Sequence, residues 1–196
     1  MSNQRLRRTR ILATIRTLLI AGGVEAVTMR EIARQSGHAV QTIYNLVGPR
    51  EHAIIEAISE YTRYVGRTSP HDPADPNSVV ALIDQWVESI AACPEFCKQV
   101  SLIALTPSRA IFYAIRERQL KGLFGLLLRQ QRSGVLRRDA NVRDLAEQMA
   151  FGASALCVEW ADRPFPVPDL QRRLTATFSN LMASALATGA RHLRLA

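Results

Sequence analysis

The sequence predicts an all-α protein of about nine helices, and three observations support this fold class. Apolar residues recur at intervals of three and four along nearly every segment, as they do on one face of a helix. No stretch shows the alternation of a half-buried strand, and no repeat of fixed period is present. The chain has 196 residues, 47% of them hydrophobic, which is enough for one substantial core or two small ones.

The first predicted helix covers about residues 4–21. Its apolar stripe is formed by Ile11, Ile15, Leu18 and Leu19, and Gly22 and Gly23 are expected to end it. Because Arg16 interrupts the apolar run, we interpret this segment as a folded amphipathic helix, the alternative being a secretory signal. No apolar run approaches the roughly 20 residues that span a bilayer, so we expect no membrane segment. The odd number of cysteines in a chain this long predicts a reducing cytoplasm.

Three further helices are expected after the first one. The sequence TMRE (residues 28–31) predicts a capping box, in which Thr28 accepts from the amide three residues on and Glu31 reaches back. This second helix extends to about Gln35, and Gly37 supplies a turn position that tolerates a positive φ. The third helix covers about residues 40–47. Gly48 and Pro49 separate it from a fourth helix over about residues 49–66.

The rest of the chain is expected to form a second, larger helical domain. A loop over residues 68–78, with three prolines, is the best candidate for a boundary within the chain. Beyond it we predict helices near residues 77–92, 94–105, 108–133, 141–161 and 168–189. We divide the chain into a helix-turn-helix domain (1–48) and a ligand-binding and dimerisation domain (49–196).

The net charge of +8 is concentrated in the first quarter of the chain. Residues 1–50 contain eight arginines against two acids, whereas the other 146 residues contain 17 basic and 15 acidic side chains. A concentrated basic region attracts a polyanion, either nucleic acid or an anionic membrane surface. The alternative is an Arg-rich surface that is simply solvated.

The first three helices, with a tight glycine turn between the second and the third, suit a helix-turn-helix unit. Ile32, Ala33 and Ile43 point inward in this arrangement, and the polar side of the third helix can enter a DNA major groove, whose base edges offer donors and acceptors. Flanking polar groups can contact phosphates. Tyr44 has the alternative of half-burial against the first helix, and Asn45 that of simple solvation. The residues predicted to contact DNA are Thr28, Ala39, Val40, Gln41, Thr42, Tyr44, Asn45 and Arg50.

The stretch TMREIARQSGHAVQTIYNLVGPREHAIIEAI (residues 28–58) resembles the DNA-binding region of the tetracycline-repressor (TetR) family of bacterial transcription regulators. The resemblance is strongest over about residues 8–55. Departures from the family pattern are His38-Ala39 in place of Val-Ser and Leu46-Val47 in place of His-Phe, with Arg50 in place of lysine. They leave the detailed DNA contacts open. The residues that match are Thr28, Glu31, Ile32, Ala33, Gly37, Thr42, Ile43, Tyr44 and Glu51.

The resemblance implies a dimeric repressor that a small-molecule effector releases from its double-stranded DNA operator. It also implies a homodimer through the last two long helices (about 141–161 and 168–189). Their wide apolar faces and interspersed small residues are consistent with that interface, although an ordinary intramolecular core is the alternative. The ligand pocket that the resemblance implies would be lined by Trp86, Phe96, Tyr113, Arg116, Met149 and Cys157.

Catalysis and metal binding find no support in the sequence. It has no Gly-rich phosphate loop, no His-Glu-x-x-His and no Gly-x-Ser-x-Gly, and its four histidines lack metal-ligand spacing. We therefore expect no enzyme, no catalytic residues, no metal and no cofactor. A helical small-molecule carrier or enzyme with a vestigial DNA-binding region remains the alternative. The three cysteines form no disulfide framework, and Cys93 and Cys97 are either buried structural residues or a thiol sensor.

Overall fold

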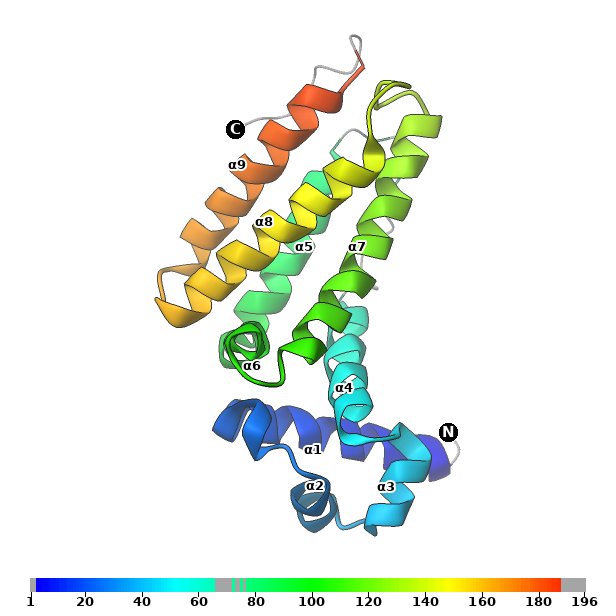
Figure 1. Cartoon of the computed structure of the whole chain (residues 1–196), viewed down its shortest axis with the longest axis vertical. Helices are drawn as coiled ribbons and strands as arrows, with labels where there is room; N and C mark the ends of the chain where they lie inside the picture. Colours follow the sequence, from blue (N-terminus) through cyan, green and yellow to red (C-terminus); the bar gives the residue numbers. More distant parts are fainter. Residues whose placement is uncertain (1–2, 66–71, 73–74, 76, 188–196) are drawn as a thin grey trace. The chain divides into compact units, whose positions relative to one another are not determined.

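The computed structural model describes residues 3–65, 72, 75 and 77–187 (Figure 1). Within these residues the chain has nine α-helices and one short 3-10 helix, and its only β-pairing is an isolated bridge between Leu136 and Leu186. The all-α prediction is therefore confirmed. Gly66, residues 188–189 and most of the 68–78 loop lie outside the described residues. In the described part of the chain, no helix is both long and apolar enough to cross a membrane.

The chain divides into two compact units. The first comprises residues 1–64 and 93–115, and the second comprises residues 65–92 and 116–196. The first unit contains α1 (Asn3–Ala26), α2 (Met29–Ser36), α3 (Val40–Val47), α4 (Arg50–Val65), α6 (Pro94–Leu102), the 3-10 helix η1 (Ile103–Leu105) and the beginning of α7 (Arg109–Arg132).

One apolar core holds the first unit together. The α1 stripe that the periodicity predicts is buried, and α2 and α3 add Ile32 and Ile43, both 0% exposed. Phe96 from α6 and Ile54 from α4 belong to the same core. The unit therefore extends well beyond residue 48, because α4 and α6 bury apolar side chains against the three N-terminal helices.

The expected end of the first helix is a break within α1. Gly22 and Gly23 leave the helical conformation, and Gly23 has a φ of 68°. A Cβ placed on Gly23 would lie 3.1 Å from Oε1 of Gln99 on α6, so a larger residue would meet both backbone strain and a close neighbour. The chain resumes helical geometry to Ala26, which sets the direction in which α2 begins.

The second unit is a helical bundle of α5 (Ser78–Ala92), the rest of α7, α8 (Val142–Asp162) and α9 (Val167–Ala185). α9 packs against both α5 and α8, and α8 and α9 run antiparallel side by side (Figure 1). They approach closely at Gly152, where an added Cβ would lie 3.2 Å from Cγ2 of Thr177. The core between these helices includes Met149, Trp160 and Phe178.

Candidate nucleic-acid interface

The α2–turn–α3 segment is shaped by signals that lie next to each other in the sequence. Thr28 caps α2, since its Oγ1 accepts from the backbone N–H of Glu31 at 3.1 Å. Gly37 ends α2 with a φ of 70°, a left-handed conformation that suits glycine. Ala39 precedes α3 without a side-chain cap, as its methyl group requires. α3 begins immediately afterwards at Val40.

The second half of the predicted capping box is not formed. The Glu31 carboxylate accepts instead from Nε of Arg34 at 2.9 Å and from Nε2 of Gln35 at 2.7 Å. The N–H of Thr28 donates to the carbonyl of Ala26 at 3.1 Å. The hydrogen bonds from Arg34 and then Gln35 lower the pKa of Glu31 to about 2. The Glu31 side chain therefore forms hydrogen bonds along the surface of α2 and does not cap its N-terminus.

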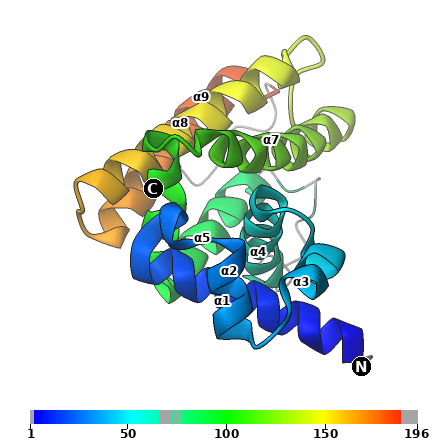
Figure 2. The ribbon, with the colours of Figure 1, turned by 60° about the horizontal axis from the view of Figure 1, so that its bottom comes forward.

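α3 lies beside α1 and α2 (Figure 2), and it has a buried side and an exposed side. Ile43 and Val47 are buried in the unit's core, and Thr42 is half-buried. On the other side Gln41 and Asn45 are exposed, and Nε2 of Gln41 donates to Oδ1 of Asn45 at 3.1 Å.

Tyr44 lies on this exposed side as well, with 45% of its surface exposed, and Val40 at the start of α3 is 36% exposed. The outer side of α3 thus presents amide, phenol and aliphatic groups together. Thr28 and Ala39, at the starts of the two helices, are also exposed.

Arg50 is placed differently from the phosphate contact that the sequence predicts. Its Nε donates to the carbonyl of Val27 at 2.5 Å and its Nη2 donates to the carbonyl of Val24 at 2.6 Å, while Glu25 lies 4.0 Å away. The half-buried guanidinium therefore joins the start of α4 to the segment between α1 and α2. Because these carbonyls already engage the guanidinium, the geometry favours a positioning role over a phosphate contact.

Much of the positive charge of α1 is paired within the first unit. Nη2 of Arg8 lies 2.9 Å from Oε2 of Glu56, and Nη1 of Arg16 lies 2.8 Å from Oε2 of Glu60. These ion pairs hold α4 against α1. The exposed arginines of the first three helices include Arg7, Arg10 and Arg30.

The six predicted pocket residues fall in different units. Phe96 and Tyr113 belong to the first unit, and the other four belong to the second. Phe96 is 2% exposed and packs edge-on against Tyr61 with ring centroids 4.9 Å apart, whereas Tyr113 is 47% exposed. Met149 and Cys157 are core residues of the bundle, and burial raises the pKa of the Cys157 thiol to about 12. The alternative of plain core thus holds for Phe96, Met149 and Cys157.

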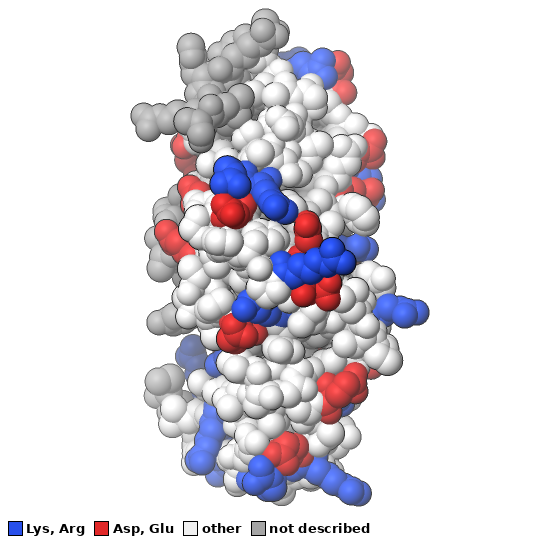
Figure 3. Space-filling view, turned by 90° about the vertical axis from the view of Figure 1, so that its left-hand side faces the viewer, with Lys and Arg blue, Asp and Glu red and all other residues white. Residues whose placement is uncertain are grey.

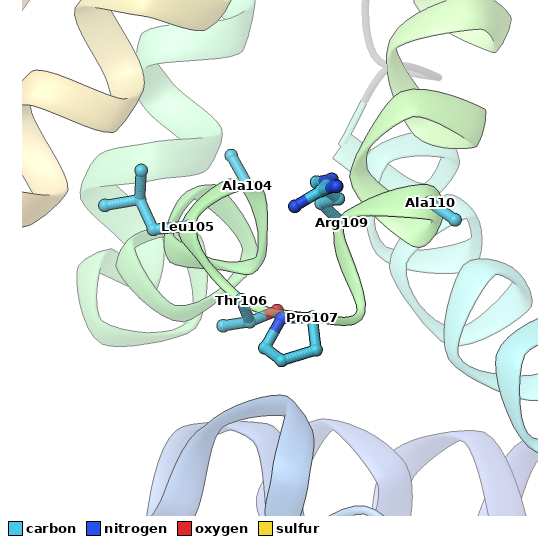
Figure 4. Close-up of a pocket in the computed structure, with 6 residues that line it drawn as sticks. All are labelled: Ala104, Leu105, Thr106, Pro107, Arg109 and Ala110. Carbon is cyan, nitrogen blue, oxygen red and sulfur yellow. The ribbon is translucent and has the colours of Figure 1, made fainter.

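A hollow of about 690 Å³ lies elsewhere in the first unit, where η1 turns into α7 (Figure 4). In Figure 4 the Arg109 side chain lies between Ala104 of η1 and Ala110 of α7. The sequence interpretation missed this site, whose only signal was the Thr-Pro-Ser turn followed by an arginine. No group of three or more metal-binding side chains occurs among the residues described. The hollow is lined by Ala104, Leu105, Thr106, Pro107, Arg109 and Ala110.

Short polar contacts connect the edge of this hollow to the helix-turn-helix segment. Oγ of Ser108 donates to Oε1 of Glu25 at 3.2 Å, and Glu25 lies 4.0 Å from the guanidinium of Arg50. Ser108 lies in the sequence between Pro107 and Arg109, which line the hollow. Glu25 therefore connects the edge of the hollow to Arg50, and Arg50 joins α4 to the segment that leads into α2.

Residues 11–45 match the family described as bacterial regulatory proteins, tetR family. This stretch contains most of α1, all of α2 and most of α3, including the exposed side of α3. Among curated proteins, none matches the chain.

Solved structures share the fold of nearly the whole chain. A TetR-family transcriptional regulator from Agrobacterium tumefaciens is 18% identical with a TM-score of 0.61, and covers 94% of this chain and 100% of its own. A protein of Syntrophomonas wolfei assigned to the same family is 15% identical with a TM-score of 0.76, covering 94% and 98%. The fatty acid degradation regulator FadR from Bacillus halodurans is 17% identical with a TM-score of 0.65, covering 95% and 97%.

Proposed function

We propose that this chain is a transcriptional regulator of the TetR family rather than an enzyme, and that it acts in the cytoplasm as a homodimeric repressor that a small molecule releases from its operator. The match of residues 11–45 to that family supports the proposal. The observation that supports the proposal most directly is the exposed polar side of α3, the helix that follows the Gly37 turn. A major groove admits one helix, and only groups on its outer side reach the base edges.

Each residue on the outer side of α3 has a chemical role in this proposal. Gln41 and Asn45 offer amides, which pair with adenine edges, and Tyr44 adds a hydroxyl. Ala39 and Val40 can contact thymine methyl groups. Thr28 and Thr42 are assigned to phosphates, which fix the register without reading the sequence. In this proposal residues 1–48 form the DNA-reading part of the first unit. Arg50 positions this part through its hydrogen bonds to the carbonyls of Val24 and Val27.

The dimer is assigned to the outer side of α8 and α9. The apolar stripes that suggested this interface are largely used inside the bundle, where Leu145, Leu170 and Leu174 are buried. Phe151 on α8 is instead 67% exposed, and Ala155 one turn later is also exposed. Two-fold symmetry would set this patch against its own copy. The face shown in Figure 3 carries acidic and basic side chains close together, with broad uncharged areas between these groups. Charges of mixed sign do not strongly repel a second copy of the chain.

Ligand release is assigned to the hollow between η1 and α7. Its aliphatic walls and the Arg109 guanidinium suit an anionic, partly apolar compound. An occupant that moves the Thr106–Ala110 turn would alter the Ser108–Glu25 hydrogen bond and, through it, the Arg50 contacts. The compound needs to prefer the state that does not bind DNA by a few kcal/mol, because equal affinity for both states shifts nothing.

Anisotropy of labelled duplexes from the DNA beside its own gene tests the DNA-binding proposal. Gln41→Ala combined with Thr42→Ala is expected to weaken specific binding about tenfold or more, since a lost base contact costs about 1–3 kcal/mol. Gln119→Ala, an exposed amide on α7, is the matched control. Unchanged affinity of the double variant would exclude α3 as the reading helix.

The salt dependence of the same binding separates a regulator from a carrier with a vestigial DNA-binding region. The affinity for duplex DNA is measured at a low and a high salt concentration. Contacts to several phosphates give a steep fall of affinity with salt, whereas a carrier shows no duplex affinity at either concentration.

Thermal stabilisation across a panel of small carboxylates tests the effector, and Arg109→Ala should abolish any stabilisation that depends on the hollow. A panel without hits at full DNA affinity would support a regulator that senses no small molecule.

A further inference from the structure

Two thiols lie at the two ends of the first turn of α6. Cys93 is the residue that precedes α6, Pro94 is its first residue, and the N–H of Cys97 donates to the carbonyl of Cys93 at 3.2 Å. Both cysteines are half-buried, while Phe96 between them is 2% exposed. The two thiols therefore lie one helical turn apart at the edge of the first unit's core.

Cys93, Cys97 and Tyr61 of α4 all pack against the apolar core of the first unit. Burial raises the pKa of Tyr61 to about 12, and the nearby Cys97 and Cys93 add to the increase. Tyr61 is also the ring against which Phe96 packs. Both thiols therefore pack against the same core at the two ends of one hydrogen-bonded turn.

The spacing of the thiols disfavours a direct disulfide. Side chains one helical turn apart have Cβ atoms roughly 5–6 Å apart, whereas a disulfide requires Cβ atoms about 3.5–4.5 Å apart. An atom bonded to both sulfurs spans a longer gap without opening the turn. Thiolates also select soft, thiophilic partners.

We propose that Cys93 and Cys97 form a dithiol site that binds a trivalent arsenic compound through both sulfurs. With an organic arsenic oxide, two As–S bonds form and two S–H bonds break. Both protons leave with the oxygen of the oxide as one molecule of water. Arsenic remains trivalent, so the step requires no oxidant or reductant.

The position of the site connects it to α1 and α4. α6 packs against α1, and Gln99, two residues after Cys97, lies beside the Gly22–Gly23 break. An adduct on the first turn of α6 thus changes the surface on which Tyr61 of α4 and the end of α1 rest. Reduced DNA affinity of the adduct is the expected consequence, and this consequence rests on the proposed function.

Intact mass spectrometry tests the site. The full chain is treated with equimolar phenylarsine oxide and washed with excess mercaptoethanol before its mass is measured. The expected result is one phenylarsenic group bound with loss of two hydrogens, retained on the order of 100-fold longer than a one-sulfur adduct because both bonds must break together. Dithiothreitol, a competing dithiol, should remove it.

Variants assign the sulfurs. Cys93→Ser and Cys97→Ser should each lose the adduct during the wash, and Cys157→Ser, which changes the buried thiol of the other unit, should retain it. Melting temperatures of the three variants show whether each is folded. Retention by a folded Cys93→Ser or Cys97→Ser variant, or loss in a folded Cys157→Ser variant, would overturn the proposal.

DNA affinity of the adduct is measured separately from its formation. A stable adduct with at least tenfold weaker duplex binding, reversed by dithiothreitol, supports regulation through this site. A stable adduct with unchanged duplex affinity overturns the regulatory part and leaves the dithiol site intact. Absence of duplex binding by the untreated chain counts against the proposed function, whereas the mass measurement is unaffected by that failure.

Discussion

α3 and the α8–α9 pair both bury their apolar residues, but they differ in the side chains that remain exposed. In α3 the apolar residues Ile43 and Val47 are buried, and the polar residues left over form the exposed side that we assign to DNA. In α8 and α9 the apolar stripes are buried as well, but one large apolar residue, Phe151, is left 67% exposed. In both regions the periodic pattern reports the core, and the residues outside the pattern indicate where a partner binds.

The two regions also differ in what stabilises them. α2 and α3 have eight residues each, too few to be stable alone, so they depend on the Thr28 cap, the Gly37 turn and the Arg50 contacts. α8 and α9 have 21 and 19 residues and depend on side chains packed between them. Substitutions should therefore separate packing, association and local hydrogen bonding as sources of stability.

The largest effect is expected from Phe178→Ala in the bundle core. Phe178 is 3% exposed on α9, and removing a buried phenylalanine side chain costs about 3–5 kcal/mol of unfolding free energy because a cavity remains. Urea denaturation measures it. Asn180→Ala, an exposed change on the same helix, should stay within about 0.5 kcal/mol. A small effect of Phe178→Ala would mean that the core collapses to fill the space.

Phe151→Ala should change association rather than folding. A central aromatic residue of an interface contributes about 2 kcal/mol or more, so the dimer dissociation constant should rise about 30-fold. Sedimentation equilibrium measures it, with Gln148→Ala, an exposed neighbour one turn earlier, as the milder control. An unchanged dissociation constant, or a wild-type chain that is monomeric, would contradict the assignment of this face.

Arg50→Ala should destabilise the first unit by about 1–3 kcal/mol, because the carbonyls of Val24 and Val27 lose their donors. Arg50→Lys restores the charge but not the two-pronged geometry and should recover only part of the loss. Arg30→Ala, an exposed arginine of α2, is the control for unfolding in urea. Normal stability of Arg50→Ala together with uniformly weaker DNA binding would restore the phosphate contact predicted from the sequence.

The smallest effect is expected from Glu31→Gln. Because the folded-state pKa of Glu31 falls from 4.5 to about 2, the charged carboxylate contributes stability above the unfolded pKa, and that stability is lost as pH falls from about 4.5 toward 2. Glu31→Gln should therefore flatten the pH dependence of unfolding in this window and change little at pH 7. An identical acid profile for the variant would show that the Arg34 and Gln35 hydrogen bonds do not persist in solution.

The sequence alone specified the features that depend on neighbouring residues. The Thr28 cap, the positive φ of Gly37 and the uncapped Ala39 follow from residue types at fixed short spacings, and they are present in the structure together with most of the predicted helix bounds. The exceptions are the capping-box contact of Glu31 and the ends of the first and last helices. The helical class follows from periodicity in the same way. The DNA-contacting residues remain a prediction, although Gln41, Tyr44 and Asn45 have the exposure that it requires.

Only the tertiary structure decided which residues are used up by packing and which remain. Arg50 meets carbonyls more than twenty positions earlier in the chain, Ser108 meets Glu25, and Phe96 joins a core built from α1 and α4. The α8 and α9 stripes are buried within one chain, leaving Phe151 outside. These outcomes depend on contacts between residues distant in sequence. A local sequence pattern predicts the side of a helix on which a side chain lies, but it does not identify the residue that this side chain contacts.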